Sequence, residues 1–313
     1  MSRGIGEFDL VQESIPEWLA VVIALLTQLG DVWFLVLVLT VLYWFDTTDR
    51  DDIAAVAGVT LAGMGLYKGL KEVFGLPRPE APLLDPTLLP RLVQPLYEAT
   101  ATAGGYGFPS GHAVNTTIVY FGLASVLSVS SRRLRYGVAA SLVSLVCFTR
   151  VALGVHYVVD VVVGVAVGLA LLFVARALLR REFADRATIT FALGIGFSTF
   201  YLVMSDRSPI AVFLLAGSLG AFGGWQLVML GRRLAVAPSR SHSVRPILLR
   251  GSATLIGAIP LVAALGGGSF VSLSTAAGVV GLATALALVV PVARHSDRAR
   301  ELYGRVRYPR RSD

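Results

Sequence analysis

Apolar runs long enough to cross a lipid bilayer recur along most of this 313-residue chain. A transmembrane helix needs about 20 largely apolar residues, and it satisfies its own backbone hydrogen bonds inside the bilayer. Hydrophobic residues make up 55% of the chain and charged residues only 15%, against roughly a quarter in soluble domains. The sequence therefore predicts an all-α, polytopic transmembrane helical bundle.

The apolar runs predict nine or ten membrane spans. The clear runs lie near 31–46, 52–74, 111–129, 137–154, 157–179, 187–205, 209–231, 248–267 and 269–293. The run at 15–31 is shorter, and it fits either a tilted span or a helix lying in the membrane interface.

Charged residues predict which ends of the spans face the cytoplasm. The formal net charge is +7, and arginines concentrate in loops 130–136, 176–186 and 231–245 and in the tail after Arg294. Cytoplasmic loops of membrane proteins carry such an excess, so we expect a multi-pass protein of the cell membrane and no nucleic-acid partner. The loop 46–52 falls on the same side although it is acidic.

Ionisable and polar residues gather at the opposite ends of a few spans, which are predicted to be extracytoplasmic. Polar groups inside membranes are costly, so each is a candidate for function. The candidates are Lys71, Arg78, Ser110, His112, Arg150, His156 and Asp160.

Each short segment taken alone also has an ordinary structural explanation. A lysine and an arginine about two helical turns apart, as at 71 and 78, are typical of interfacial snorkelling. The segment PSGH (109–112) fits a plain loop-to-helix junction with a serine N-cap. His156 and Asp160 are four residues apart and share a helical face, which suits a structural pair or a catalytic one.

A phosphate ligand fits the whole set better than a metal ion does. Two histidines and one aspartate make a sparse metal site, and the single cysteine, Cys147, excludes a cysteine cluster. Cationic side chains neutralise phosphoryl oxygens, and a helix N-terminus offers N–H donors to an anion. One histidine could attack phosphorus while the other protonates the leaving oxygen. We expect no metal and no cofactor.

Three motifs in order resemble those of the type 2 phosphatidic acid phosphatases, which are membrane lipid phosphate phosphatases related to vanadium haloperoxidases and glucose-6-phosphatase. They read KEVFGLPRP (71–79), PSGH (109–112) and TRVALGVHYVVD (149–160). Thr149 stands where the family usually has serine, which retains a hydroxyl. The resemblance covers about residues 15–180 and implies metal-independent hydrolysis at one membrane surface through a phosphohistidine.

The resemblance also implies a role for each candidate residue. His156 would be the nucleophile, Asp160 would orient and charge it, and His112 would protonate the leaving group and then activate water. The residues that would hold the phosphoryl oxygens are Lys71, Arg78, Ser110, Gly111 through its N–H, and Arg150.

The substrate implied is a lipid phosphate, with phosphatidic acid, phosphatidylglycerol phosphate and polyprenyl diphosphate all open. Two alternatives keep the same site, namely a phosphoryl or phospholipid group transferase and a non-catalytic transporter or scaffold. The loop 80–108 carries Tyr97, Tyr106 and Phe108, which either line the entrance or anchor the loop in the membrane interface; anchoring is favoured.

The predicted domains are a phosphatase core at 1–180, an additional helix bundle at 181–293 and a basic cytoplasmic tail at 294–313. We expect five or six helices in the core and about four more in the bundle, whose role the sequence leaves open. Gly220 and Gly224 predict close helix packing there. The tail is expected to attract anionic lipid headgroups.

Overall fold

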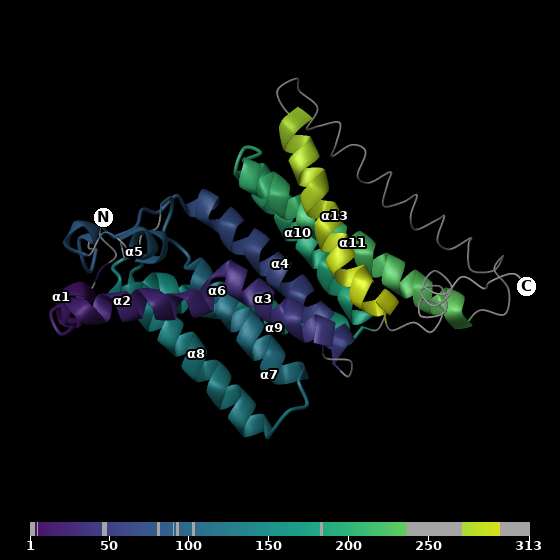
Figure 1. Cartoon of the computed structure of the whole chain (residues 1–313), viewed down its shortest axis with the longest axis horizontal. Helices are drawn as coiled ribbons and strands as arrows, with labels where there is room; N and C mark the ends of the chain where they lie inside the picture. The colour runs from purple at the N-terminus through teal and green to yellow at the C-terminus, as the bar shows by residue number, and fades with distance from the viewer. Residues whose placement is uncertain are drawn as a thin grey trace, which may run out of the picture. The chain divides into compact units, whose positions relative to one another are not determined.

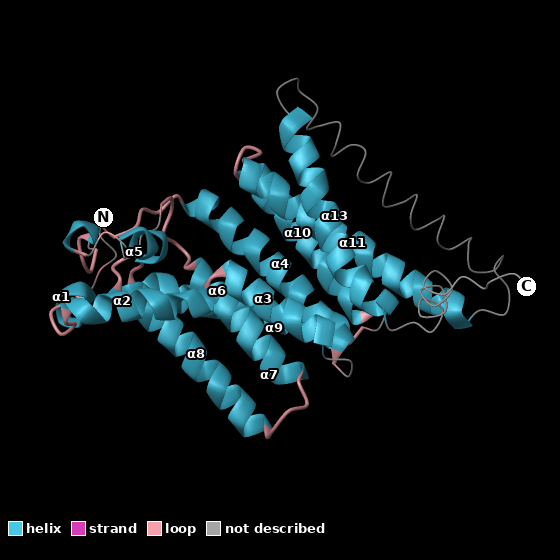
Figure 2. Ribbon diagram, in the orientation of Figure 1, coloured by secondary structure: helices cyan, strands magenta, loops and turns pink. Residues whose placement is uncertain are grey.

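All regular secondary structure in the described part of the chain is helical. The computed structural model describes residues 4, 6–45, 49–79, 82–89, 91, 94–101, 104–181, 184–236 and 271–294. Figure 2 shows helices and loops but no strand within these residues. The chain divides into two compact units, Met1–Leu214 and Leu215–Asp313, and each is described by itself.

Six helices in the described residues are long and apolar enough to span a membrane. They are α4 (Arg50–Phe74), α8 (Arg132–Ala152), α9 (Val158–Leu179), α10 (Arg186–Met204), α11 (Pro209–Val236) and α13 (Val271–Arg294). The shorter helices are α1 (Glu7–Gln12), α2 (Glu17–Leu26), η1 (Thr27–Gly30), α3 (Val32–Phe45), η2 (Pro86–Leu88), α5 (Gln94–Ala101), α6 (Gly111–Thr116), η3 (Thr117–Phe121) and α7 (Gly122–Val126).

The count is smaller than the nine or ten spans predicted. Two of the predicted runs do not form a full span. Run 31–46 forms the 14-residue α3, which is too short, and the π-helical turn η3 divides run 111–129 between α6 and α7. A seventh span results if residues 18–30 and α3, which meet at a bend of 48°, count as one. The predicted span at 248–267 lies outside the described residues.

Helix α2 lies along one end of the bundle rather than across it. Gln12, just before α2, donates a hydrogen bond to the carbonyl of Ala152, and Thr27, just after α2, accepts one from Arg150. Both partners belong to the last turn of α8, so both ends of α2 are held at the same end of that helix. Trp18 on α2 is 70% exposed, as expected of an interfacial helix. Of the two explanations for run 15–31, these contacts favour the interfacial one.

The ends of α4 follow from its sequence. Asp51 and Asp52 lie in its first turn, where carboxylates interact favourably with the helix dipole. Gly75 ends the helix in the left-handed conformation, with φ of +58°, and its N–H bonds to the carbonyl of Lys71. Lys71 is thereby placed in the last turn, and the chain leaves the helix toward Arg78.

Helices α4 and α10 pack with almost no space between their backbones, and Figure 1 shows them side by side. A Cβ atom added at Gly58 would overlap Thr190, and one added at Gly65 would overlap the backbone of Phe197. Small residues let membrane helices approach closely, which maximises van der Waals contact. In the second unit, Gly220 of α11 faces the backbone of Gly281 in α13 in the same way, which confirms the close packing predicted there.

Replacing Gly65 by alanine should destabilise the first unit, because the new Cβ would collide with backbone atoms of Phe197. Overpacking costs about 1–3 kcal/mol, more than the roughly 1 kcal/mol that Gly→Ala gains in a helix interior. Gly196→Ala on α10 is the matched control, since its Cβ would meet nothing within 4 Å. Thermal unfolding in detergent should rank G65A below wild type and G196A at or above it. Equal melting temperatures for the two variants would contradict this packing.

Candidate active site

A cavity of about 440 Å³ lies where α2–η1–α3, α4, α6 and α8 meet at one end of the bundle. Six of the eight residues predicted for the site line it: Lys71, Arg78, Gly111, His112, Arg150 and His156. The other two, Ser110 and Asp160, are completely buried behind the wall of the cavity. The structure thus brings the three predicted motifs to one place.

His156 is held between a carboxylate and a guanidinium. Its Nδ1 lies 3.4 Å from Oδ2 of Asp160, and its Nε2 lies 3.0 Å from Nη1 of Arg78. The same Asp160 oxygen accepts a hydrogen bond from the N–H of Tyr157, which fixes the carboxylate at the start of α9. Only Nε2 therefore faces the cavity.

Burial lowers the pKa of His156 well below its usual value, and the charges of Arg78 and Arg150 lower it further. Desolvation and nearby cations both disfavour the imidazolium. The ring is therefore neutral at physiological pH. With Nδ1–H directed at Asp160, Nε2 carries the lone pair, and this lone pair accepts a hydrogen bond from Nη1 of Arg78 on the cavity side.

Arg78 ties together three segments that are distant in sequence. Its Nε donates to the carbonyl of Gly104 at 3.1 Å, and its Nη1 donates to the carbonyl of Val155 at 3.0 Å. Together with the contact to His156, these bonds use the planar, multiply donating geometry that arginine has and lysine lacks. Lys71 makes a similar long-range contact, donating to the carbonyl of Tyr106 at 2.7 Å.

The start of α6 is fixed against the start of α9. The N–H of Ser110 donates to the backbone carbonyl of Asp160 at 2.9 Å. Ser110 is the N-cap residue of α6, and its buried hydroxyl has no hydrogen-bond partner among the described residues. Gly111 packs so closely on Tyr67 that a Cβ would lie 2.5 Å from the ring. This helix start leaves backbone N–H groups and a free hydroxyl beside the cavity, an arrangement that suits an anion.

His112 has a partner that the sequence analysis missed. Its Nε2 lies 3.0 Å from Oδ1 of Asp31, which follows η1 and also lines the cavity. Nearby, Nη1 of the buried Arg150 donates to Oγ1 of Thr27 at 3.0 Å. An ionisable residue at the end of an apolar run was a usable signal for Asp31, but nothing in the spacing linked it to His112.

The aromatic residues of loop 80–108 differ in their roles. Tyr106 lines the cavity, as the entrance explanation required. Tyr97 is buried in a cluster with Ala20 and Ile23 of α2, so it does not anchor the loop in the membrane interface. Phe108 packs edge-on against Phe74, with ring centroids 5.1 Å apart.

The electrostatics of the cavity favour a multiply charged anion. Four cationic side chains line it, namely Lys68, Lys71, Arg78 and Arg150, while Asp31 and Glu72 are its only carboxylates among the described residues. No group of three or more His, Cys, Asp or Glu side chains in the described part of the chain is arranged to hold a metal ion. The donor set is that of an oxyanion site, in which cations and amide N–H groups face phosphoryl oxygens.

Comparisons with known proteins cover the segment that carries the three motifs. Residues 52–184 match the PAP2 superfamily, and this segment of the chain belongs to that superfamily. Lipid phosphate phosphatase delta of Arabidopsis thaliana is 34% identical over 110 residues, which cover 33% of this chain and 25% of that protein. Phosphatidylglycerophosphatase B of Bacillus subtilis (strain 168) is 33% identical over 90 residues, covering 27% of this chain and 44% of that protein.

The chain therefore spans less than half the length of either of these two curated relatives. No solved structure matches the chain. Asp31 and Thr27 lie before the segment that matches the superfamily. The contact of Asp31 with His112 and that of Thr27 with Arg150 are therefore made by the part of the chain that precedes this segment.

The cavity should bind orthovanadate, a tetrahedral oxyanion, and Arg78→Lys should weaken this binding. Lysine cannot donate to Gly104, Val155 and the ligand at once, and losing charge-assisted hydrogen bonds of this kind costs about tenfold or more in affinity. Isothermal titration calorimetry on the detergent-solubilised chain measures the effect. Arg91→Lys is the matched control, because Arg91 is exposed and lies outside the cavity. Equal weakening in both variants would show that Arg78 does not act as a ligand.

Proposed function

We propose that this chain is a membrane phosphatase that hydrolyses lipid phosphate monoesters or diphosphates through a phosphohistidine intermediate. One observation carries the proposal. His156, His112 and four cationic side chains line the same cavity, and Nε2 of His156 faces it while Asp160 lies behind the ring. Membership of residues 52–184 in the PAP2 superfamily supports this function.

In the first step, Nε2 of His156 attacks phosphorus and the bond from phosphorus to the leaving oxygen breaks. His112 gives its proton to that oxygen, so the lipid leaves as a neutral alcohol or as a phosphate monoester. Lys71, Arg78 and Arg150 offset the charge on the equatorial oxygens in the transition state. Asp160 stabilises the positive charge that develops on the His156 ring, in the manner of other histidine–aspartate pairs.

In the second step, a water molecule attacks the phosphohistidine. His112, now neutral, takes a proton from this water, and the phosphorus–nitrogen bond breaks to release inorganic phosphate. The cycle returns His112 to its protonated form and His156 to its neutral form. No step consumes a co-reactant other than water.

Asp31 acts on this cycle through His112. A carboxylate 3.0 Å from Nε2 holds the ring in one orientation. Burial lowers the pKa of His112 to about 4, and Asp31 partly offsets this effect by stabilising the charged form that donates the proton. Asp31 is therefore a positioning residue, held in place by the bend between η1 and α3. Gly30 allows this approach, because a Cβ there would lie 2.9 Å from Cδ2 of His112.

The substrate, topology and domain roles complete the proposal. Phosphatidic acid, phosphatidylglycerol phosphate and polyprenyl diphosphate each place a phosphate at the membrane surface while their chains stay in lipid.

The arginine-rich loops favour insertion in the cell membrane with the site on the extracytoplasmic side. We assign catalysis to a core at 1–180 and treat 181–293 as an additional bundle, and 294–313 as a cytoplasmic tail.

Phosphate release from these lipids should persist in EDTA and should vanish in His156→Ala. The reaction proposed needs a nucleophile and cations but no metal, so chelation removes nothing essential. The measurement is inorganic phosphate released by the purified chain in detergent, with glycerol added as a competing acceptor. Activity lost in EDTA and restored by magnesium would contradict the mechanism, as would full activity of H156A. Phosphorylated glycerol in place of free phosphate would identify a transferase.

Asp31→Asn should lower kcat by about tenfold to hundredfold with little change in KM, because a misplaced proton donor slows chemistry more than binding. Glu72→Gln is the matched control, since it removes a carboxylate from the same cavity without touching His112. Rapid-quench measurement of the phosphoenzyme should show slower formation and slower breakdown in D31N, because both steps use His112. Equal rates in D31N and E72Q would show that Asp31 contributes only negative charge to the cavity and does not position His112.

A further inference from the structure

A second cavity, of about 550 Å³, lies at the opposite end of the same helices. Asp52 at the start of α4, Tyr136 near the start of α8 and Arg186 at the start of α10 all line it. The catalytic residues Lys71 and Arg150 lie instead at the far ends of α4 and α8. The two cavities therefore open near opposite surfaces of the membrane that the helices span.

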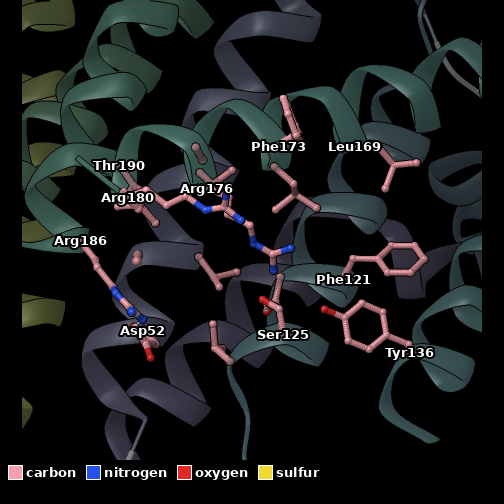
Figure 3. Close-up of a pocket in the computed structure, with 18 residues that line it drawn as sticks. Asp52, Phe121, Ser125, Tyr136, Leu169, Phe173, Arg176, Arg180, Arg186 and Thr190 are labelled. Atoms are coloured by element: carbon pink, nitrogen blue, oxygen red, sulfur yellow. Dashed lines mark hydrogen bonds and ion pairs between the residues drawn. The ribbon is translucent and has the colours of Figure 1, made fainter. Parts of the chain in front are cut away.

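The second cavity holds more positive charge than its own carboxylate offsets. Its charged residues within the described part of the chain are Arg176, Arg180, Arg186 and Asp52. Arg186 is paired with Asp52 at 2.7 Å. Figure 3 shows the side chains of Arg176 and Arg180 extending into the middle of the cavity instead. Neither guanidinium has a hydrogen-bond or ion-pair partner among the described residues, so two positive charges face the cavity without a counterion from that part of the chain.

One face of α9 runs from apolar to cationic along this cavity. Leu169, Phe173, Arg176 and Arg180 follow one another at helical spacing and all line it. Leu169 and Phe173 are 45% and 73% exposed, although both are apolar, so this rim of the cavity faces lipid. The distance along the helix from Leu169 to Arg180 is about 16 Å, close to the thickness of one leaflet's hydrocarbon layer.

We propose that this cavity binds an anionic phospholipid of the leaflet opposite the catalytic site. The headgroup phosphate lies between Arg176 and Arg180, and one acyl chain runs along Phe173 and Leu169 toward the bilayer centre. Basic pockets between membrane helices on the cytoplasmic side are suited to such headgroups. Snorkelling alone accounts for arginines at a helix end, but it does not account for two guanidinium groups converging in a cavity with an apolar floor.

The ligand is a lipid rather than a free anion, because the cavity matches both parts of an amphiphile. Phe121 and Leu172 extend its apolar wall, whereas the groups at the other end are charged. A soluble phosphate would use only the arginines and would leave the apolar wall in contact with water or detergent. Chain and headgroup together therefore bind more tightly than the headgroup alone.

Native mass spectrometry of the full chain in a mild detergent tests the site. The probe is dioleoylphosphatidylglycerol, a phosphodiester that is not a substrate of the monoester and diphosphate chemistry proposed above. Wild type should retain this lipid, and the double variant Arg176→Gln, Arg180→Gln should bind it about thirtyfold more weakly, because each arginine near an anionic headgroup contributes roughly fivefold. Dioleoylphosphatidylcholine should be retained weakly by both proteins.

A charge-matched control distinguishes lipid binding in this cavity from general electrostatic attraction between the protein and anionic lipids. Arg133 and Arg181 are exposed arginines at the same ends of α8 and α9, but they do not line the cavity. Arg133→Gln, Arg181→Gln should therefore bind the lipid like wild type. An equal loss in both double variants would overturn the proposal, and so would binding of soluble glycerophosphoglycerol as tight as that of the lipid.

A measurement on the wild-type protein tests the site even if the double variant misfolds. A phosphatidylglycerol that carries a photoreactive diazirine at the end of one acyl chain should label peptides from the apolar part of the cavity, around residues 165–173 of α9. Labelling should fall when unmodified dioleoylphosphatidylglycerol is added in excess. Labelling spread evenly over all lipid-facing helices would overturn the proposal whatever the variants do.

Discussion

The candidate active-site cavity depends on the position of Asp160 at the first turn of α9. Its carboxylate accepts the N–H of Tyr157 and faces Nδ1 of His156, while its backbone carbonyl accepts the N–H of Ser110. One buried residue thus orients His156, the proposed nucleophile, starts a helix and fixes the N-terminus of α6. Such a buried carboxylate is stable only with several partners, because an unpaired charge in a low-dielectric interior is very costly.

Close helix packing holds these partners in register. Glycines at 164 and 168 let α9 touch α6, since a Cβ at Gly164 would lie 2.7 Å from the carbonyl of Ser110. Glycines on α4 do the same for α10, so α10 forms part of the first compact unit together with the superfamily segment. In a membrane, where apolar burial between helices gains little, such contact is a main source of stability. The geometry of the site is therefore set by residues that carry no chemistry.

The same helices present chemically different surfaces at their two ends. At one end, cations are combined with two histidines and a helix N-terminus, which suits phosphoryl transfer. At the other end, arginines lie beside an apolar wall, and no histidine of the described residues lines the cavity, which suits binding without reaction. The proposed enzyme would bind lipid headgroups at both membrane surfaces and would react with them at only one.

The sequence by itself determined the helical class, most span positions and all eight candidate residues of the site. Local patterns sufficed for these because an apolar run of span length has few alternatives in a bilayer. The motif residues also sit at helix ends that glycine, proline and capping residues mark in the sequence. The sequence even indicated close packing at Gly220, since small residues at helical spacing have that consequence.

Only the tertiary structure decided the contacts between segments that are far apart in the chain. It placed α2 along the end of the bundle, paired Asp31 with His112, and turned Tyr97 inward. It also placed the arginines at the end of α9 in one cavity with residues of α4, α7, α8 and α10. None of these follows from periodicity or from local charge, because each depends on how closely and at what angle separate helices pack. The packing distance between two helices depends on the volume of the side chains that face each other, including glycines that have none. The effect of a glycine can therefore be judged only when the residues opposite it on the other helix are known.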